Sequence, residues 1–123
     1  MEDKSLYIAI LLTLLIAYLS FISLNKIIPK LEFGYFDKIA HLISYLSLSF
    51  SWFLALCLKN ESNLKTIIIV LSITIYGIII EIIQGNYTPN READFYDVLA
   101  NTIGVLIGLV LFILWIQKRK LLK

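Results

Sequence analysis

Acid and amide side chains gather in one stretch of the chain, from Glu81 to Gly108, at spacings that suit a helix. Its second half places polar or small residues three, four, three and four positions apart: Asp94, Asp97, Asn101, Gly104 and Gly108. Just upstream, another set recurs at similar intervals: Thr74, Gly77, Glu81 and Gln84. Because residues three and four apart share one helix face, the stretch predicts two helices whose polar faces meet across a short turn.

A third polar face lies upstream and contains Asp37, His41, Ser44 and Ser51. Carboxylates partly withdrawn from water can act as general acid or base, and together with an imidazole they suit a divalent cation. The catalytic candidates are therefore His41, Glu81 and Asp97. The metal-ligand candidates are Asp37, His41, Glu81 and Asp97. The alternatives are structural: Asp37 can cap a helix or interact with its dipole, and His41 can be a hydrogen-bonded core residue.

Composition places these residues in a membrane. The 123 residues are 59% hydrophobic and 16% charged, whereas soluble domains carry about 25% charged residues. Four apolar runs come close to the roughly 20 residues that cross a bilayer: about 5–24, 38–58, 65–84 and 95–116. Lipid offers no partner to free backbone groups, so we expect these runs to be helices. The sequence predicts an all-α, polytopic membrane protein, a single domain over residues 1–123 folded as a four-transmembrane-helix bundle.

The three polar faces agree in depth as well as in direction. At about 1.5 Å of rise per residue, Glu81 lies near the outer end of its helix when that helix starts at Thr66 on the inner side. Asp37 and Asp97 lie near the same interface, and His41 and Asn101 lie about 6 Å deeper. We therefore expect one cavity beneath the outer surface, lined by Asp37, His41, Glu81, Gln84, Arg91, Asp97 and Asn101.

Lysine and arginine set the expected orientation, because cytoplasmic flanks carry an excess of both. With the amino terminus inside, the inner segments hold seven of these residues and the outer segments hold four. Both termini of this multi-pass protein are then cytoplasmic, and the polar faces lie at the external side of the plasma membrane. The net charge of +2 comes mostly from the QKRKLLK tail, which suits anionic inner-leaflet lipid and implies no nucleic-acid partner.

Several chemistries find no support in the sequence. The single cysteine, Cys57, excludes a disulfide within the chain and a two-cysteine metal or redox motif. No serine-nucleophile motif, phosphate loop, HExxH or GxGxxG occurs. A polar layer confined to one leaflet provides no path across the membrane, so transport ranks last.

The remaining candidates concern packing and charge. Gly104 and Gly108 form a small-xxx-small pair, and Gly77 lies one turn before Glu81. Such glycines let helix backbones approach closely, which is the role we expect for all three. Arg91, the one basic residue in its loop, is expected to neutralise the acids around it: Asp94, Asp97 or Glu81.

The ordered set of motifs resembles the VanZ-like membrane proteins. The motifs are FDKIAH with Asp37, Lys38 and His41, EIIQ with Glu81 and Gln84, TPNR with Pro89 and Arg91, and DVLANTIGVLIG with Asp97, Asn101, Gly104 and Gly108. Asp94 stands in a slot that varies in the family, and the GNYTPN turn departs from the more apolar turn common there. The resemblance implies a small helical membrane protein of the bacterial cell envelope. The name-giving member is linked to reduced susceptibility to glycopeptide antibiotics with lipid-like features.

Three functions remain open. In the first, the polar groups recognise a lipid or lipid-linked envelope precursor at the outer leaflet. In the second, they form an intramembrane enzyme that acts on a lipid or cell-wall precursor. In the third, they make a purely structural network. The ligand-binding candidates are Asp37, Lys38, His41, Glu81, Gln84, Arg91, Asp94, Asp97 and Asn101. The sequence requires no cofactor, although the acids and the histidine are compatible with a divalent cation. It leaves the oligomeric state open.

Overall fold

The computed structural model describes residues 2–22, 34–58, 62–87 and 92–122. They form four α-helices: α1 (Glu2–Phe21), α2 (Gly34–Cys57), α3 (Asn63–Tyr87) and α4 (Phe95–Leu121). All four are long and apolar enough to span a membrane. The prediction of an all-α protein with four transmembrane helices is confirmed.

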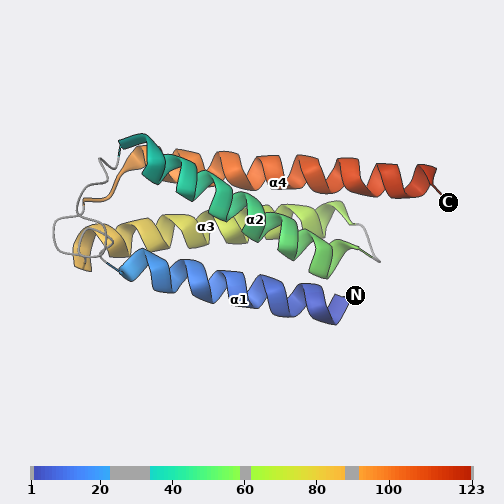
Figure 1. Ribbon diagram of the computed structural model, residues 1–123, viewed down its shortest axis with the longest axis horizontal. Helices are drawn as coiled ribbons and strands as arrows, with labels where there is room; N and C mark the ends of the chain where they lie inside the picture. Colours follow the sequence, from blue (N-terminus) through green and yellow to red (C-terminus); the bar gives the residue numbers. More distant parts are fainter. Residues whose placement is uncertain (1, 23–33, 59–61, 88–91, 123) are drawn as a thin grey trace.

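The helices form an elongated bundle (Figure 1). The start of α1 and the end of α4 lie at one end of the bundle, and the starts of α2 and α4 lie at the other. α2 runs obliquely between α1 and α4, and it contacts each of the other three helices. This central position lets α2 carry side chains toward every polar face predicted from the sequence.

All four helices extend beyond the predicted apolar runs, and α1 does so at its start, which is Glu2. α4 continues from the predicted 116 to Leu121, with basic residues in its last turn; lysine and arginine are good helix formers and interact favourably with a helix C-terminus. α3 continues from 84 to Tyr87, so that Gly85 and Asn86 of the expected turn are helical. α2 begins at Gly34, which places Asp37 in its first turn. Asp37 is therefore placed to interact with the helix dipole but is not the N-terminal cap.

The core of the bundle is aromatic and aliphatic, while the outside exposes large apolar side chains along all four helices. Tyr45, Leu48, Phe53 and Val105 are almost fully buried, and Phe53 stacks on Phe112 with ring centroids 5.5 Å apart. The exposed apolar residues need no protein partner, because in a bilayer the hydrocarbon chains surround them.

The backbones of α2 and α4 approach closely at two glycines of α4. A Cβ atom on Gly104 would collide with the carbonyl oxygen of Leu42 and lie 3.0 Å from the backbone nitrogen of Leu46. A Cβ atom on Gly108 would overlap the hydroxyl of Ser49 and lie 2.8 Å from the Leu46 carbonyl oxygen. Only hydrogen fits at these positions, so the glycines set the separation of the two helices.

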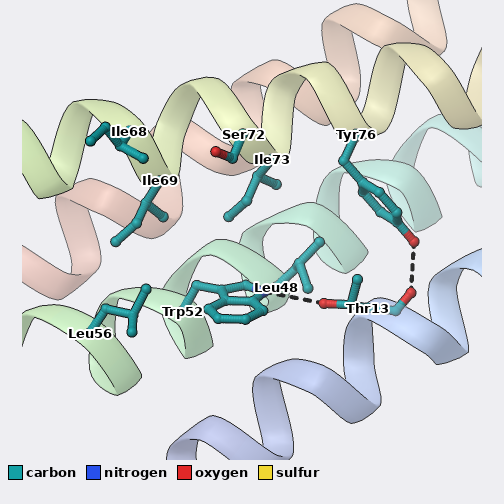
Figure 2. Close-up of a pocket in the computed structure, with 9 residues that line it drawn as sticks. All are labelled: Thr13, Leu48, Trp52, Leu56, Ile68, Ile69, Ser72, Ile73 and Tyr76. Atoms are coloured by element: carbon teal, nitrogen blue, oxygen red, sulfur yellow. Dashed lines mark hydrogen bonds between the residues drawn. The ribbon is translucent and has the colours of Figure 1, made fainter.

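Hydrogen bonds around Thr13 link α1 to the bundle (Figure 2), in addition to its buried apolar residues Ala9 and Ile16. The Trp52 indole nitrogen donates to the Thr13 hydroxyl at 3.2 Å, and the Tyr76 hydroxyl donates to the Thr13 backbone carbonyl at 2.6 Å. A pocket of about 310 Å³ lies beside this contact, lined almost entirely by apolar side chains of α2 and α3. Thr13 thus links α1 to both neighbouring helices near the middle of the membrane span.

Candidate functional site

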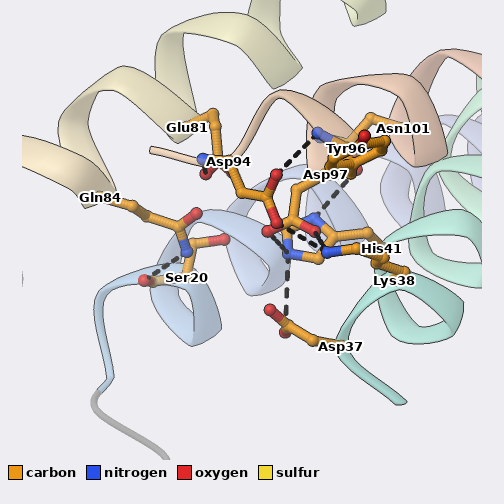
Figure 3. A network of polar contacts seen from close by, with 10 residues as sticks. All are labelled: Ser20, Asp37, Lys38, His41, Glu81, Gln84, Asp94, Tyr96, Asp97 and Asn101. Carbon is orange, nitrogen blue, oxygen red and sulfur yellow. Dashed lines mark hydrogen bonds and ion pairs between the residues drawn. The ribbon is translucent and has the colours of Figure 1, made fainter. Parts of the chain in front are cut away.

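Lys38, in the first turns of α2, is the cation around which the polar end of the bundle is arranged (Figure 3). Its Nζ donates to Asp94 Oδ2 at 2.7 Å and to Asp97 Oδ1 at 3.1 Å. The Asp97 side chain is only 4% exposed. A buried carboxylate is costly unless it is paired, so Lys38 makes the position of Asp97 tolerable and ties α2 to the start of α4.

Asp94 joins the ends of α3 and α4. Its Oδ1 caps α4 by accepting from the Tyr96 backbone nitrogen at 2.8 Å, and its own backbone nitrogen donates to Glu81 Oε1 at 2.8 Å. The Lys38 hydrogen bond, followed by the bond from Tyr96, lowers the pKa of Asp94 below its ordinary 3.8. The hydrogen bonds from Lys38 and Tyr96 therefore stabilise the ionised form of the Asp94 carboxyl group.

His41 is held by Asn101 and faces two carboxylates. Its Nδ1 lies 3.0 Å from Asn101 Oδ1, and Asn101 is 2% exposed. An amide oxygen only accepts hydrogen bonds, so Nδ1 carries the proton. The other ring nitrogen, Nε2, lies 3.8 Å from Asp37 Oδ1 and 3.9 Å from Asp97 Oδ2. In the neutral ring this nitrogen presents its lone pair toward both carboxylates.

A pocket of about 130 Å³ adjoins this histidine. α1 contributes a mainly apolar wall, and α2 and α3 contribute mainly polar groups; the lining residues are Ile16, Leu19, Ser20, Asp37, Ala40, His41, Ser44, Tyr45 and Gln84. Gln84 Nε2 donates to the Ser20 backbone carbonyl at 2.8 Å (Figure 3). Within the described part of the chain, the buried Gln84 Oε1 and Tyr45 hydroxyl have no hydrogen-bond partner. The pocket thus combines an apolar side with unsatisfied polar groups.

The structure brings most of the sequence-predicted site residues into one layer at this end of the bundle. We call this set the polar layer: Asp37, Lys38, His41, Glu81, Gln84, Asp94, Asp97 and Asn101. The predicted Arg91, with its expected ion pairs, lies outside the described residues. The roles of the polar layer in binding or catalysis remain predictions.

Two predictions about individual residues need refinement. Of the four predicted metal ligands, Asp37, His41 and Asp97 offer ligand atoms within 4.8 Å of one another. Glu81 is not part of this group, and its Oε1 accepts the backbone hydrogen bond of Asp94. Gly77 faces the polar layer itself, since a Cβ there would lie 2.9 Å from Tyr45 Cε1 and 3.3 Å from Asn101 Nδ2. Its missing side chain makes room for the residue that holds His41.

Sequence reasoning missed Tyr45 and the backbone carbonyl of Ser20. Tyr45 follows His41 by four positions, which places both on one face of α2. That spacing was a usable signal, although an aromatic residue in an apolar helix is ordinarily assigned to the core. The Ser20 carbonyl had no signal, because a backbone acceptor leaves no trace in the sequence.

Comparison with known proteins agrees with the architecture and with the motifs that build the polar layer. The chain matches the VanZ/LLP1 family over residues 5–116, a range that includes all of the polar layer. No curated protein and no solved structure matches it. Since the matched range covers nearly the whole chain, this multi-pass membrane protein belongs to the VanZ/LLP1 family.

Proposed function

We propose that the protein recognises a lipid or lipid-linked headgroup at the outer leaflet of the bacterial plasma membrane. The observation that carries this proposal is the pocket beside His41, where Ile16 and Leu19 of α1 stand opposite the polar groups of α2 and α3. A molecule with an apolar portion and a polar head matches both sides of such a site.

The orientation that goes with this proposal has both termini in the cytoplasm. It rests on the excess of lysine and arginine at the end of the bundle that holds the termini. A cysteine placed at Asn86, which is exposed at the end of α3, tests it in a chain whose Cys57 is replaced by alanine. Labelling by an impermeant reagent in intact cells is expected. Labelling only after permeabilisation would move the polar layer to the cytoplasmic side.

The unsatisfied polar atoms give the pocket its selectivity. Gln84 and Tyr45 are each 1% exposed, and a buried polar atom without a hydrogen bond costs about 1 to 3 kcal/mol. A bound headgroup with hydroxyl, amide or phosphate groups offsets that cost, whereas a plain acyl chain does not. Recognition of a polar head therefore follows from the chemistry of the lining.

The cellular effect that we propose is lowered susceptibility to lipid-bearing glycopeptide antibiotics. Cells that express the protein are expected to tolerate such an antibiotic better than cells without it, and a glycopeptide that lacks the lipid portion serves as the control. Asp97→Asn and Glu81→Gln preserve size but remove charge from the polar layer. They are expected to leave an inserted, folded protein and to abolish the protection. Full protection by folded Asp97→Asn and Glu81→Gln proteins would show that the polar layer stabilises the bundle and does not take part in the protection.

A second candidate is an intramembrane enzyme that acts on a lipid or a cell-wall precursor. The observation that favours it is the position of His41 Nε2 beside two carboxylates at the pocket, where in the neutral ring it is placed to accept a proton from a substrate. Conversion of an added lipid-linked precursor by the purified protein, lost in His41→Gln, distinguishes this activity from recognition alone.

A further inference from the structure

We infer that Asp37, His41 and Asp97 form a binding site for a divalent transition-metal ion, with Zn²⁺ as the best match. The ligand atoms are Asp37 Oδ1, His41 Nε2 and Asp97 Oδ2. This inference stands on the arrangement of these three side chains and does not depend on the proposed recognition of a lipid.

The protonation of His41 is the first argument. A metal binds the lone pair of a neutral imidazole, and the other ring nitrogen of a ligating histidine donates its proton to an oxygen that fixes the ring. Asn101 Oδ1 is such an oxygen, 3.0 Å from Nδ1. In the neutral ring this hydrogen bond directs the Nε2 lone pair at the two carboxylates, which is the tautomer that binds a metal through Nε2.

The distances are the second argument. The separations of 3.8 and 3.9 Å between Nε2 and the carboxylate oxygens exceed the roughly 3.2 Å limit of a good hydrogen bond. Ligand atoms lie about 2.0 to 2.2 Å from a tetrahedral Zn²⁺, which places two of them about 3.4 Å apart. The three ligand atoms all lie within 4.8 Å of one another, and small side-chain rotations would bring them onto one ion.

The surroundings hold the ligands in place, as outer-shell groups do in metal sites. Lys38 binds Asp97 through Oδ1 and thereby leaves Oδ2 facing His41. Asn101, which orients the imidazole, is itself buried, and a Cβ atom at Gly77 would lie only 3.3 Å from its Nδ2. Each of Asp97 and His41 thus has one atom fixed by a neighbour and another aimed at the same point.

The adjoining pocket supplies the independent observation that a ligand belongs here. Asp37 and His41 line it together with Tyr45 and Gln84, whose buried Tyr45 hydroxyl and Gln84 Oε1 have no hydrogen-bond partner among the described residues. Three protein ligands leave at least one coordination position of Zn²⁺ open for water or another oxygen ligand. A metal-bound water or headgroup oxygen in the pocket would give these two polar atoms a partner.

The donor set selects the class of metal. Mg²⁺ and Ca²⁺ favour sites made of oxygen ligands, whereas imidazole suits zinc and other transition metals. Charge favours binding as well, because the carboxylates of Asp37 and Asp97 both lie beside His41. A dication interacts favourably with carboxylates in a region of low dielectric.

The test uses the full chain, purified in detergent without a polyhistidine tag, stripped of metal with a chelator and then titrated with Zn²⁺. One equivalent per chain is expected, with a rise in the thermal midpoint. Asp37→Asn, His41→Gln and Asp97→Asn should each weaken Zn²⁺ binding by more than about 100-fold, beyond the effect of losing an outer-shell partner. Glu92→Gln removes an exposed carboxylate at the same end of the bundle and should leave binding unchanged.

Because His41 is the one histidine in the chain, nitrogen-15 labelling of histidine reports on the site even if a variant fails to fold. The expected spectrum shows a neutral ring protonated at Nδ1, whose Nε2 resonance shifts when Zn²⁺ is added. A ring protonated at both nitrogens that ignores Zn²⁺ would overturn the inference. So would equal binding by the wild type and folded His41→Gln, or a preference for Mg²⁺ or Ca²⁺ over Zn²⁺.

Discussion

The pair formed by α2 and α4 and the single helix α1 are held in the bundle in different ways. At Gly104, α2 and α4 approach until a methyl group would collide with the Leu42 carbonyl. Fewer residues are buried in α1 than in α4, and hydrogen bonds at Thr13 and Ser20 supply the directional contacts of α1. Close backbone packing and the Lys38 ion pairs position α2 against α4, whereas hydrogen bonds and a few apolar contacts hold α1.

The same two regions make different contributions to the site: α2 and α4 carry polar groups, and α1 forms part of the pocket wall. The groups whose mutual distances matter, His41, Asp97 and Asn101, all stand on α2 and α4. α1 contributes Ile16, Leu19 and Ser20 to the wall of the pocket. The chemistry therefore rests on the closely packed pair, while α1 borders the pocket.

The largest effect is expected from Gly104→Leu. A side chain at this position has to push α2 and α4 apart against backbone atoms of Leu42 and Leu46, and overpacking of this kind costs on the order of 3 kcal/mol. Chemical unfolding in detergent should show this loss of stability. Leu106→Ala, which shortens an exposed side chain of α4, is the control and should change stability little. A Gly104→Leu protein as stable as the wild type would mean that steric fit does not fix the pair.

An intermediate effect is expected from Lys38→Met. The substitution keeps an unbranched apolar side chain but leaves the nearly buried Asp97 carboxylate without its ammonium partner, at a cost of about 2 kcal/mol. Adding Asp97→Asn to the variant removes the unpaired charge and should recover most of the stability, since Asp94 is more exposed and keeps access to polar surroundings. If the double variant is no more stable than Lys38→Met, the ion pair is not what ties α2 to α4.

The smallest effect is expected from Tyr76→Phe, which removes one hydrogen bond between α3 and the Thr13 carbonyl. Hydrogen bonds between membrane helices contribute about 0.6 kcal/mol on average. Global stability should fall by no more than this, whereas proteolysis or hydrogen exchange confined to α1 should increase. Equal acceleration of hydrogen exchange in α1 and α4 would show that α1 does not detach independently of the α2–α4 pair.

The four helices could be predicted from the sequence because length and apolar composition alone decide whether a segment spans a bilayer. The helix ends could not. Residues such as Asn86 and Tyr87 fall in a stretch that reads as a turn, yet they continue α3. Hydropathy marks where a helix can leave the hydrocarbon, while the helix itself continues as long as its backbone hydrogen bonds persist.

For the site, periodicity predicted which residues share a face but not which ones touch. His41 and Asn101 follow from helical spacing, and the structure joins them at 3.0 Å. The role of Lys38 does not follow from spacing, because a long side chain reaches acids one helix away and its partners depend on how α2 crosses α4. Tyr45 and Tyr76 carry polar atoms on residue types that also fill cores, so their hydrogen-bonding demands could not be predicted from type alone.

The way α1 is attached determines which positions can be substituted without loss of the contacts. Tyr76 and Gln84 donate to backbone carbonyls of Thr13 and Ser20, and every amino acid has a backbone carbonyl. These two contacts therefore require particular side chains only at the donors in α3. Position 20 can hold any residue that keeps the helix, and position 13 additionally needs the hydroxyl that Trp52 binds. A substitution at position 20 that keeps α1 apolar and helical is therefore expected to preserve the Gln84 contact, whereas replacing Gln84 by an apolar residue removes it.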